Sequence, residues 1–216
     1  MHAMESKVAE KLEFFFSQFK PLKIRKGQII YRPEDEISNI YLIRKGLVRQ
    51  YSISENGDEV TINFFRPNSF FPIMLILSNQ PNKYFFEAQS DLDLFQAPFQ
   101  KVLEFLQKEP TVLFDLTKRF AAGLNGLSQR LSGLMFENAA RRVTSLLVYL
   151  SKKFGEEKDG WIIIQLPLTH QDIASWVNLT RETASRKIEN LVKLGIISHN
   201  NKLLVIKDIK KLEGLL

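Results

Sequence analysis

The stretch Thr169–Gly195 constrains the fold more than any other part of the 216-residue chain, because it has the pattern of two capped helices joined by a tight turn. Thr169 can cap the first helix, and Asp172, three residues later, gives a near capping box. Asn178 stands where the turn needs a positive φ, which asparagine tolerates. Thr180 then caps the second helix. The sequence therefore predicts a helix-turn-helix.

One side of each predicted helix is apolar, as packing against a core requires. Leu179 can fill the angle between the two helices. The apolar residues are Ile173, Ala174 and Val177 in the first helix, and Ala184, Ile188, Leu191 and Val192 in the second.

The other side of the second helix carries the residue types that proteins use to read bases. Arginine offers two donors to guanine, glutamate accepts from cytosine, and serine can bond to several base edges. A recognition helix places its N-terminal turns in the major groove of DNA. A solvated helix face with Glu182 and Arg186 paired at i, i+4 is the alternative interpretation. The exposed residues are Arg181, Glu182, Ser185, Arg186 and Glu189.

The distribution of charge agrees with DNA binding. The net charge is +6 and the isoelectric point is about 9.4. The part up to Phe136 has 17 basic and 15 acidic residues, whereas the shorter part from Glu137 has 13 and 9. A modest positive charge is ordinary by itself, but here its excess surrounds the two helices, as phosphate binding requires. We expect base contacts from Arg181, Glu182, Ser185 and Arg186, and phosphate contacts from Thr180, Lys187 and Lys202.

Several classes of protein are disfavoured by what the sequence lacks. It has no cysteine, which excludes disulfides, iron–sulfur clusters and cysteine nucleophiles. The histidines are His2, His170 and His199, all outside the β-rich part, so haem sensing, metal sensing and any other cofactor are not expected. No glycine-rich phosphate loop or nucleophile motif is present, and we expect no enzyme activity.

The N-terminus lacks an uninterrupted apolar signal core. The longest apolar run, Phe70–Leu77, is far shorter than the roughly 18–20 residues of a membrane span. We therefore expect a cytoplasmic protein without a membrane partner.

The first half of the chain has a β-rich texture. Residues 4–20 place apolar residues at helical spacing and predict a short helix that ends before Pro21. Residues 21–98 are short β-rich runs between turn residues, and Asn56-Gly57 is the clearest hairpin signal. This spacing of turns predicts an all-β sandwich or roll.

Residues 99–108 predict a short helix, and a long helix is expected from about Thr111 to Met135. Its apolar residues repeat as the a and d positions of a heptad, which favours a parallel contact between two copies of the helix. A helix that packs inside its own chain is the alternative. Gly133 weakens the helix and is the candidate hinge, with the segment 133–138 as the moving joint. The seam consists of Leu113, Thr117, Phe120, Leu124, Leu127, Leu131 and Leu134.

The remaining segments complete a winged helix-turn-helix. The sequence predicts a helix over 138–154, a polar loop over 155–160 and a strand over 161–168. After Gly195 a hairpin with Asn200-Asn201 at its tip forms the wing, and a short helix closes the chain. The predicted domains are 1–109, 110–137 and 138–216.

The segment Leu168–Ser198 resembles the signature helix-turn-helix of the Crp-Fnr family of bacterial transcription regulators, through its Arg-Glu-Thr-x-Ser-Arg core and Gly-Ile-Ile exit. In that family the positions of Arg181, Glu182 and Arg186 contact bases, and Ser185 joins them in the Fnr-like branch. Two residues depart from the pattern: Asn178 replaces the usual turn glycine, and Lys187 replaces an aliphatic residue.

The resemblance implies an α+β fold: an N-terminal jelly-roll-like β-roll sensor domain, a dimerisation helix and the C-terminal winged helix. The β part is similar to the family's cyclic-nucleotide-binding roll through the spacing of Gly27, Gly46 and Gly57. The family's nucleotide binders carry Gly-Glu and Arg-Ser or Arg-Thr pairs where this sequence has Pro72-Ile73 and Lys83-Tyr84. Lysine does not replace the arginine fork. We therefore predict that cyclic AMP is not bound.

What the roll holds instead is left open by the sequence. Its many aromatic residues either line an apolar effector site, with Lys83 as an anion partner, or fill the roll as core. The candidate effector residues are Phe71, Ile73, Lys83, Tyr84 and Leu124.

The leading hypothesis is a homodimeric regulator that reads an inverted repeat in double-stranded DNA. RNA polymerase is a partner implied by the resemblance, and the small-molecule effector is unidentified. The alternative is a sensor or interaction module whose helix-turn-helix only packs, and steep salt dependence of DNA binding distinguishes the two.

Overall fold

The computed structural model describes residues 2–200 and 203–216, with side chains from Lys7 onward. The chain divides into two compact units, Met1–Gly123 and Leu124–Leu216. The division falls inside the long helix α4 (Pro110–Phe136), which the sequence prediction treats as a segment of its own over 110–137. The second half of α4 therefore belongs with the C-terminal elements.

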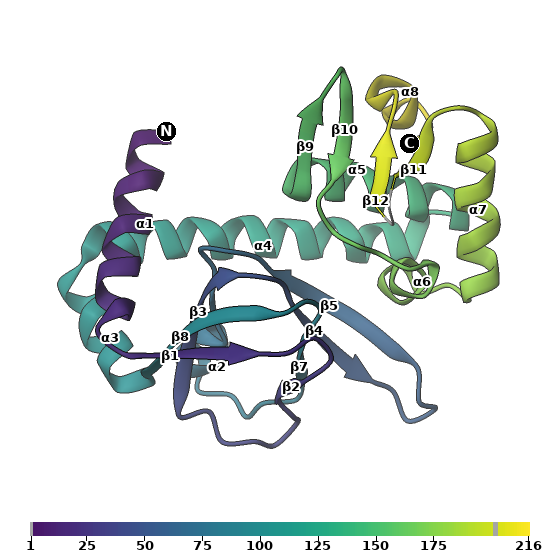
Figure 1. The fold of residues 1–216 in the computed structure, drawn as a ribbon. Coiled ribbons are helices and arrows are strands. Elements are labelled where there is room, and N and C mark those ends of the chain that lie inside the picture. Colours follow the sequence, from purple (N-terminus) through teal and green to yellow (C-terminus); the bar gives the residue numbers. More distant parts are fainter. Residues whose placement is uncertain (1, 201–202) are drawn as a thin grey trace. The chain divides into compact units, whose positions relative to one another are not determined.

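The first unit is a β-roll with helices on one side (Figure 1). Its antiparallel sheets have the strand orders β1-β8-β3-β6 and β2-β7-β4-β5. The strands are β1 (Lys20–Ile24), β2 (Ile29–Tyr31), β3 (Asn39–Lys45), β4 (Val48–Ile53), β5 (Glu59–Phe65), β6 (Phe70–Phe71), β7 (Phe85–Ala88) and β8 (Leu92–Pro98). The helices are α1 (His2–Ser17), α2 (Ile73–Ser78), α3 (Phe99–Lys108) and the first part of α4. The predicted roll is confirmed.

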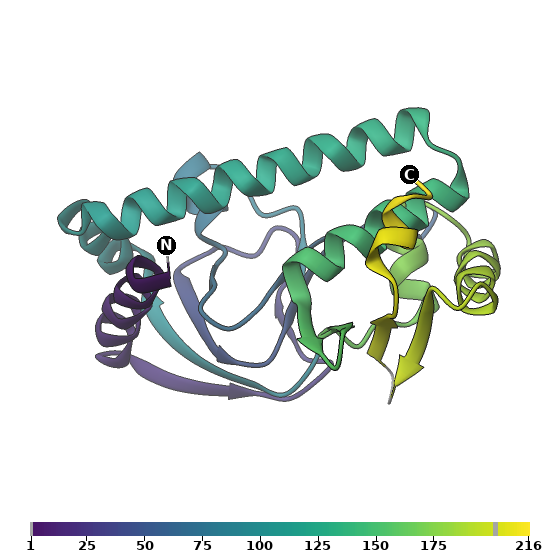
Figure 2. The same ribbon diagram turned by 90° about the horizontal axis from the view of Figure 1, so that it is seen from above.

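Strand β3 shows why two cores form, because alternate side chains of a strand point to opposite faces. Tyr41 and Ile43 lie in the core between the sheets, whereas Ile40 and Leu42 lie in a second core beneath the helices. Figure 2 shows α1 and α3 side by side, and the rings of Phe15 and Phe105 stack there at 4.2 Å. The α4 residues in this second core are Val112 and Leu116, with Phe120 partly buried.

The second unit is a helical core with a four-stranded sheet of order β11-β12-β10-β9. Two hairpins, β9–β10 and β11–β12, stand next to each other in Figure 1. The elements are α5 (Ala139–Phe154), β9 (Gly155–Lys158), β10 (Trp161–Ile164), α6 (His170–Val177), α7 (Arg181–Lys193), β11 (Ile197–Asn200), β12 (Leu203–Ile206) and α8 (Ile209–Glu213).

Two sequence predictions are wrong in this unit. The polar loop expected over 155–160 is strand β9 and a turn, in which Asp159 and Gly160 adopt φ values of 53° and 79°. Positive φ at both residues is typical of a two-residue hairpin turn, and Asp-Gly is its common sequence. Val192, which the helical spacing placed on the buried side, is 38% exposed, whereas Leu191 beside it is buried as expected.

None of the helices that the structure describes combines the length and apolar character that crossing a bilayer requires.

Candidate nucleic-acid interface

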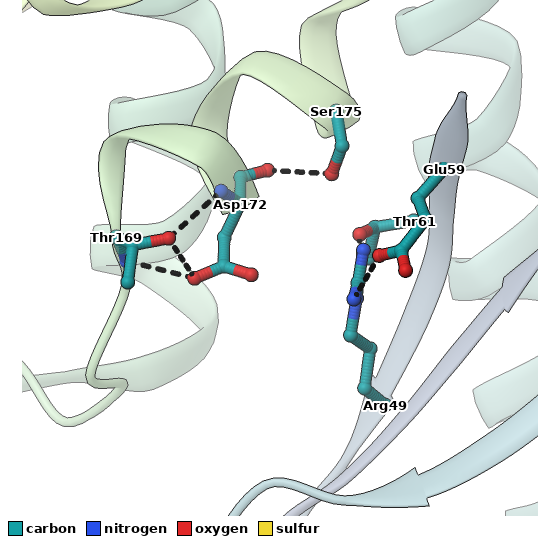
Figure 3. Close-up of polar contacts among 6 residues, drawn as sticks. All are labelled: Arg49, Glu59, Thr61, Thr169, Asp172 and Ser175. Carbon is teal, nitrogen blue, oxygen red and sulfur yellow. Dashed lines mark hydrogen bonds and ion pairs between the residues drawn. The ribbon is translucent and has the colours of Figure 1, made fainter. Parts of the chain in front are cut away.

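The helix-turn-helix begins with the predicted capping box at Thr169 (Figure 3). The Thr169 hydroxyl accepts from the backbone N–H of Asp172 at 3.1 Å, and the Asp172 carboxylate accepts from the Thr169 N–H at 2.8 Å. Two N–H groups at the helix start, which have no partner within a helix, are thereby satisfied. The cap fixes the residue at which α6 begins.

The turn after α6 depends on Asn178, which adopts φ 51° and ψ 58° in the left-handed region. The guanidinium of Arg142, on α5, donates to the carbonyl of Val177 at 3.0 Å and to that of Asn178 at 3.4 Å. These carbonyls have no partner further along α6, because the helix ends there. Sequence reasoning missed Arg142, since nothing local signals a bond to residues 35 and 36 positions away.

Thr180 caps helix α7, and its hydroxyl accepts from the Thr183 N–H at 3.2 Å. Its apolar side buries Ala184, Ile188 and Leu191. The caps and the buried side together fix the opposite side toward solvent.

That opposite side presents Arg181, Glu182 and Arg186 as exposed side chains. The pair Glu182–Arg186 is not within ion-pair distance, and none of the three forms an ion pair with another residue that the structure describes. Their charges are therefore free to meet an external partner, as the DNA interpretation requires. The alternative interpretation, a solvated helix face with Glu182 and Arg186 paired, is not supported, because this ion pair does not form.

Ser185 differs from its neighbours, because it is half-buried and already engaged. Its hydroxyl lies 2.9 Å from Nδ1 of His170 and donates to the Glu189 carboxylate at 3.0 Å. Burial is the main cause that lowers the pKa of His170, and neighbouring His199 and Arg181 lower it further, while Glu189 opposes them. Sequence reasoning missed both His170 and Glu189 as partners of Ser185.

The predicted phosphate contacts have different surroundings. Thr180 is exposed and Lys187 is half-buried. Lys202 and Asn201, one of the two residues of the predicted tip, lie outside the described residues. The other, Asn200, is the last residue of β11, and the strands of the wing pair from Ile197 with Ile206 to Asn200 with Leu203. The wing hairpin itself is confirmed.

The heptad seam of α4 is largely solvent-exposed in the single chain. Leu113, Leu124, Leu127, Leu131 and Leu134 are between 42% and 66% exposed, and Thr117 is exposed as well. Phe120 departs from the seam, because it packs partly against the core of the first unit. A stripe of exposed leucines on a helix favours a partner surface over an intramolecular core.

The candidate hinge residue Gly133 is buried and lies inside the second unit. A Cβ there would lie 2.9 Å from a carboxylate oxygen of Glu137, which accepts from the Ser145 hydroxyl at 3.0 Å. The hinge stays a prediction.

Two of the candidate effector residues lie in different cores of the first unit. Phe71 is buried between the sheets, where it stacks on Tyr41 at 5.5 Å, while Ile73 lies in the core beneath the helices. Tyr84 is half-buried beside the first of these cores, and Lys83 is exposed. Leu124 belongs to the second unit. Ring-to-ring packing of Phe65, Phe71 and Phe86 supports the core interpretation of these aromatics.

Within the part of the chain that the structure describes, no group of three or more histidine, aspartate or glutamate side chains is placed to hold a metal ion.

Two domain families match this chain, the cyclic nucleotide-binding domain over residues 21–109 and the Crp-like helix-turn-helix domain over residues 141–215. The chain is 31% identical over 198 residues to the global nitrogen regulator of Synechococcus elongatus, covering 86% of each protein. It is 26% identical over 206 residues to the fumarate and nitrate reduction regulatory protein of Yersinia pestis, covering 95% of this chain and 81% of the relative.

Solved structures agree with these relatives. A transcriptional regulator of the CRP/FNR family from Thermus thermophilus is 27% identical, covers 91% of this chain and 97% of that one, and superposes with a TM-score of 0.69. A CooA mutant from Carboxydothermus hydrogenoformans has the same fold, with a TM-score of 0.78 at 23% identity over 93% of this chain and 88% of that one. The chain belongs to the Crp-Fnr family of DNA-binding transcription regulators.

Proposed function

We propose that this regulator acts as a homodimer that reads an inverted repeat, with one α7 helix of each copy in the major groove. The observation that carries the proposal is the free, charged face of α7, where Arg181, Glu182 and Arg186 stand exposed and unpaired among the described residues. Two such helices related by a dimer axis would lie about 34 Å apart, one turn of B-DNA.

Each residue of the face has a defined chemical task. Arg181 and Arg186 offer bidentate donors that suit guanine, and Glu182 accepts from a cytosine amino group. Ser185 contacts a base edge, whereas Thr180, Lys187 and Lys202 hold the protein on phosphates. The division predicts which substitutions alter sequence preference and which weaken binding to every sequence.

The dimer contact is assigned to the leucine seam of α4. Exposure of Leu124, Leu127 and Leu131 supports it, because a solvated row of leucines is costly unless another surface covers it. Gly133, at the base of α4, is the candidate hinge for movement of the DNA-binding elements.

The proposal extends to regulation and partners. An effector site in the roll would involve Lys83 and Tyr84, but cyclic AMP is not the ligand, because Ile73 and Lys83 replace its acidic and arginine partners. RNA polymerase is the proposed protein partner, and the protein works in the cytoplasm as a binding protein and not as an enzyme.

Substitution of Arg186 tests the readout. Arg186→Ala is expected to weaken binding to the preferred site by about 1–3 kcal/mol and to relax base preference at one position of each half-site. Lys187→Ala is the matched control, because loss of a phosphate contact weakens all sequences alike. A base-preference profile that is unchanged by Arg186→Ala would show that Arg186 does not read DNA. Binding without sequence preference in the parent protein would favour the interaction-module alternative.

A further inference from the structure

We propose that Ser185 reads an exocyclic amino group, on adenine or cytosine, because Glu189 holds its hydroxyl proton and leaves only a lone pair for DNA. Glu189 and His170 are thereby specificity-determining residues that need not touch a base. The inference rests on the proposed base contact of Ser185 and adds the identity of the group that Ser185 recognises.

The three side chains form one short chain of hydrogen bonds. Ser185 and Glu189 stand one turn apart on α7, and the hydroxyl donates to Glu189 Oε1 at 3.0 Å. His170 is the first residue of α6, and its Nδ1 lies 2.9 Å from the same hydroxyl oxygen. Both distances are within the range of good hydrogen bonds.

The direction of each bond follows from the number of protons. A hydroxyl has one proton and two lone pairs, and an ionised carboxylate only accepts. The proton of Ser185 therefore goes to Glu189, and His170 has to donate through Nδ1–H to one lone pair of the oxygen. The second lone pair is what the hydroxyl can offer to a base.

The charge of His170 does not reverse this arrangement. Nδ1 carries a proton both in the required neutral tautomer and in the imidazolium form. The titratable and charged groups that face His170 are His199 on β11, whose ring centroid lies 6.1 Å away, and Arg181 and Glu189 on α7. Burial of His170 favours the neutral form. The recognised group is therefore expected to be the same at neutral and at mildly acidic pH.

A lone pair distinguishes bases in the major groove. Adenine and cytosine present amino donors there, at N6 and N4, whereas guanine O6 and N7 and thymine O4 only accept. An unconstrained serine can serve as donor or acceptor and tolerates all four bases. A serine with its proton committed to Glu189 accepts only, and so it selects adenine or cytosine on the strand that it contacts.

The test uses the full-length protein and its preferred duplex, obtained by selection from a random pool. Comparison of base profiles between the parent protein and Ser185→Ala locates the base that Ser185 contacts. A base analogue that lacks the amino group, purine for adenine or pyrimidinone for cytosine, is then placed there. We expect removal of the amino group to weaken the parent protein roughly three- to tenfold, and Ser185→Ala to add no further loss on that duplex.

Glu189→Gln tests the committed proton. A glutamine amide can donate to the Ser185 oxygen and release the hydroxyl proton. Removal of the amino group from the base should then weaken the binding of this variant little or not at all. Glu213→Gln removes an equal charge on α8, where Glu213 pairs with Lys152 at 2.9 Å, and removal of the amino group should weaken its binding as much as that of the parent protein. Glu189→Ala, which leaves no acceptor at that position, repeats the comparison and also serves if Glu189→Gln fails to fold.

The outcomes separate this inference from the proposed function. If Ser185→Ala alters base preference at no position of the duplex, the base contact itself is absent and the inference is overturned. Ser185→Ala can instead alter base preference at one position where removal of the amino group does not change the affinity. If a deazapurine without the N7 acceptor then abolishes the affinity difference between the parent protein and Ser185→Ala, Ser185 donates and the inference is overturned. If Glu189→Gln and Glu189→Ala both leave the parent preference intact, Glu189 does not control the proton.

Discussion

Substitution of Leu131 on α4 makes the sharpest prediction about assembly. Leu131 is 61% exposed in the single chain, and burial of a whole leucine side chain is worth about 1.5–3 kcal/mol. A symmetric dimer buries the residue once in each copy, so burial of the exposed part of Leu131 stabilises the dimer by about 2–4 kcal/mol. Leu131→Ala removes most of that area, and the dimer Kd should rise by about 30- to 1,000-fold.

Sedimentation velocity over a range of protein concentrations measures that Kd directly. Leu194→Ala is the matched control, because Leu194 follows α7 and is 63% exposed but does not belong to the seam. We expect the control to dimerise like the parent protein. Equal dimer Kd values for Leu131→Ala and Leu194→Ala would refute the assignment of the α4 seam to the dimer contact.

Three further predictions concern the cap, a histidine and the roll. Thr169→Ala removes the capping box and should lower the free energy of unfolding by about 1 kcal/mol in denaturant titration, whereas a change of only a few tenths would contradict the cap's role. Because the folded pKa of His170 lies below the unfolded value of 6.5, the unfolded state binds more protons, and stability should fall as pH drops through 6.5. The loss of stability between pH 7.5 and 5.5, measured by thermal melting at each pH, should be larger for the parent protein than for His170→Gln. Equal losses in the two proteins would contradict the role of His170. Calorimetric titration should show no micromolar binding of cyclic AMP, and saturable heat in that range would overturn the argument from Ile73 and Lys83.

The elements of this fold that could be predicted from sequence are those with local causes. Thr169 and Thr180 predict where helices begin, because their hydroxyls accept from N–H groups three residues later. Asn178 predicts the turn, because few residues tolerate the positive φ that it adopts. The heptads of α4 and the alternation in β3 follow from the periods of the helix and the strand. These features account for the winged helix-turn-helix and the roll.

Two of the features that sequence reasoning missed depend on residues that are distant in the chain. Arg142 reaches carbonyls 35 and 36 residues away, and His170 reaches Ser185 across 15 residues. No local pattern encodes either contact. Strand β9 is different, because Asp159-Gly160 is a local hairpin signal that the acidic composition of Gly155–Gly160 obscured.

The proposed effector site shows the limit of sequence order as a guide to proximity. Phe71 and Ile73 are two residues apart, yet their side chains lie in different cores because a short strand ends and α2 begins between them. The aromatics that cluster in sequence around them pack ring against ring in the roll. Of the candidate effector residues in the roll, Lys83 is exposed and Tyr84 is half-buried.

Selection of duplexes from a random pool, at two salt concentrations and without added ligand, tests the central claim most directly. We expect enrichment of an inverted repeat whose half-site centres are about one helical turn apart, and an affinity that falls steeply with salt. Arg186→Ala should lose the enrichment at one base pair of each half-site. Binding that is indifferent to both sequence and salt would contradict the claim that the exposed face of α7 reads DNA.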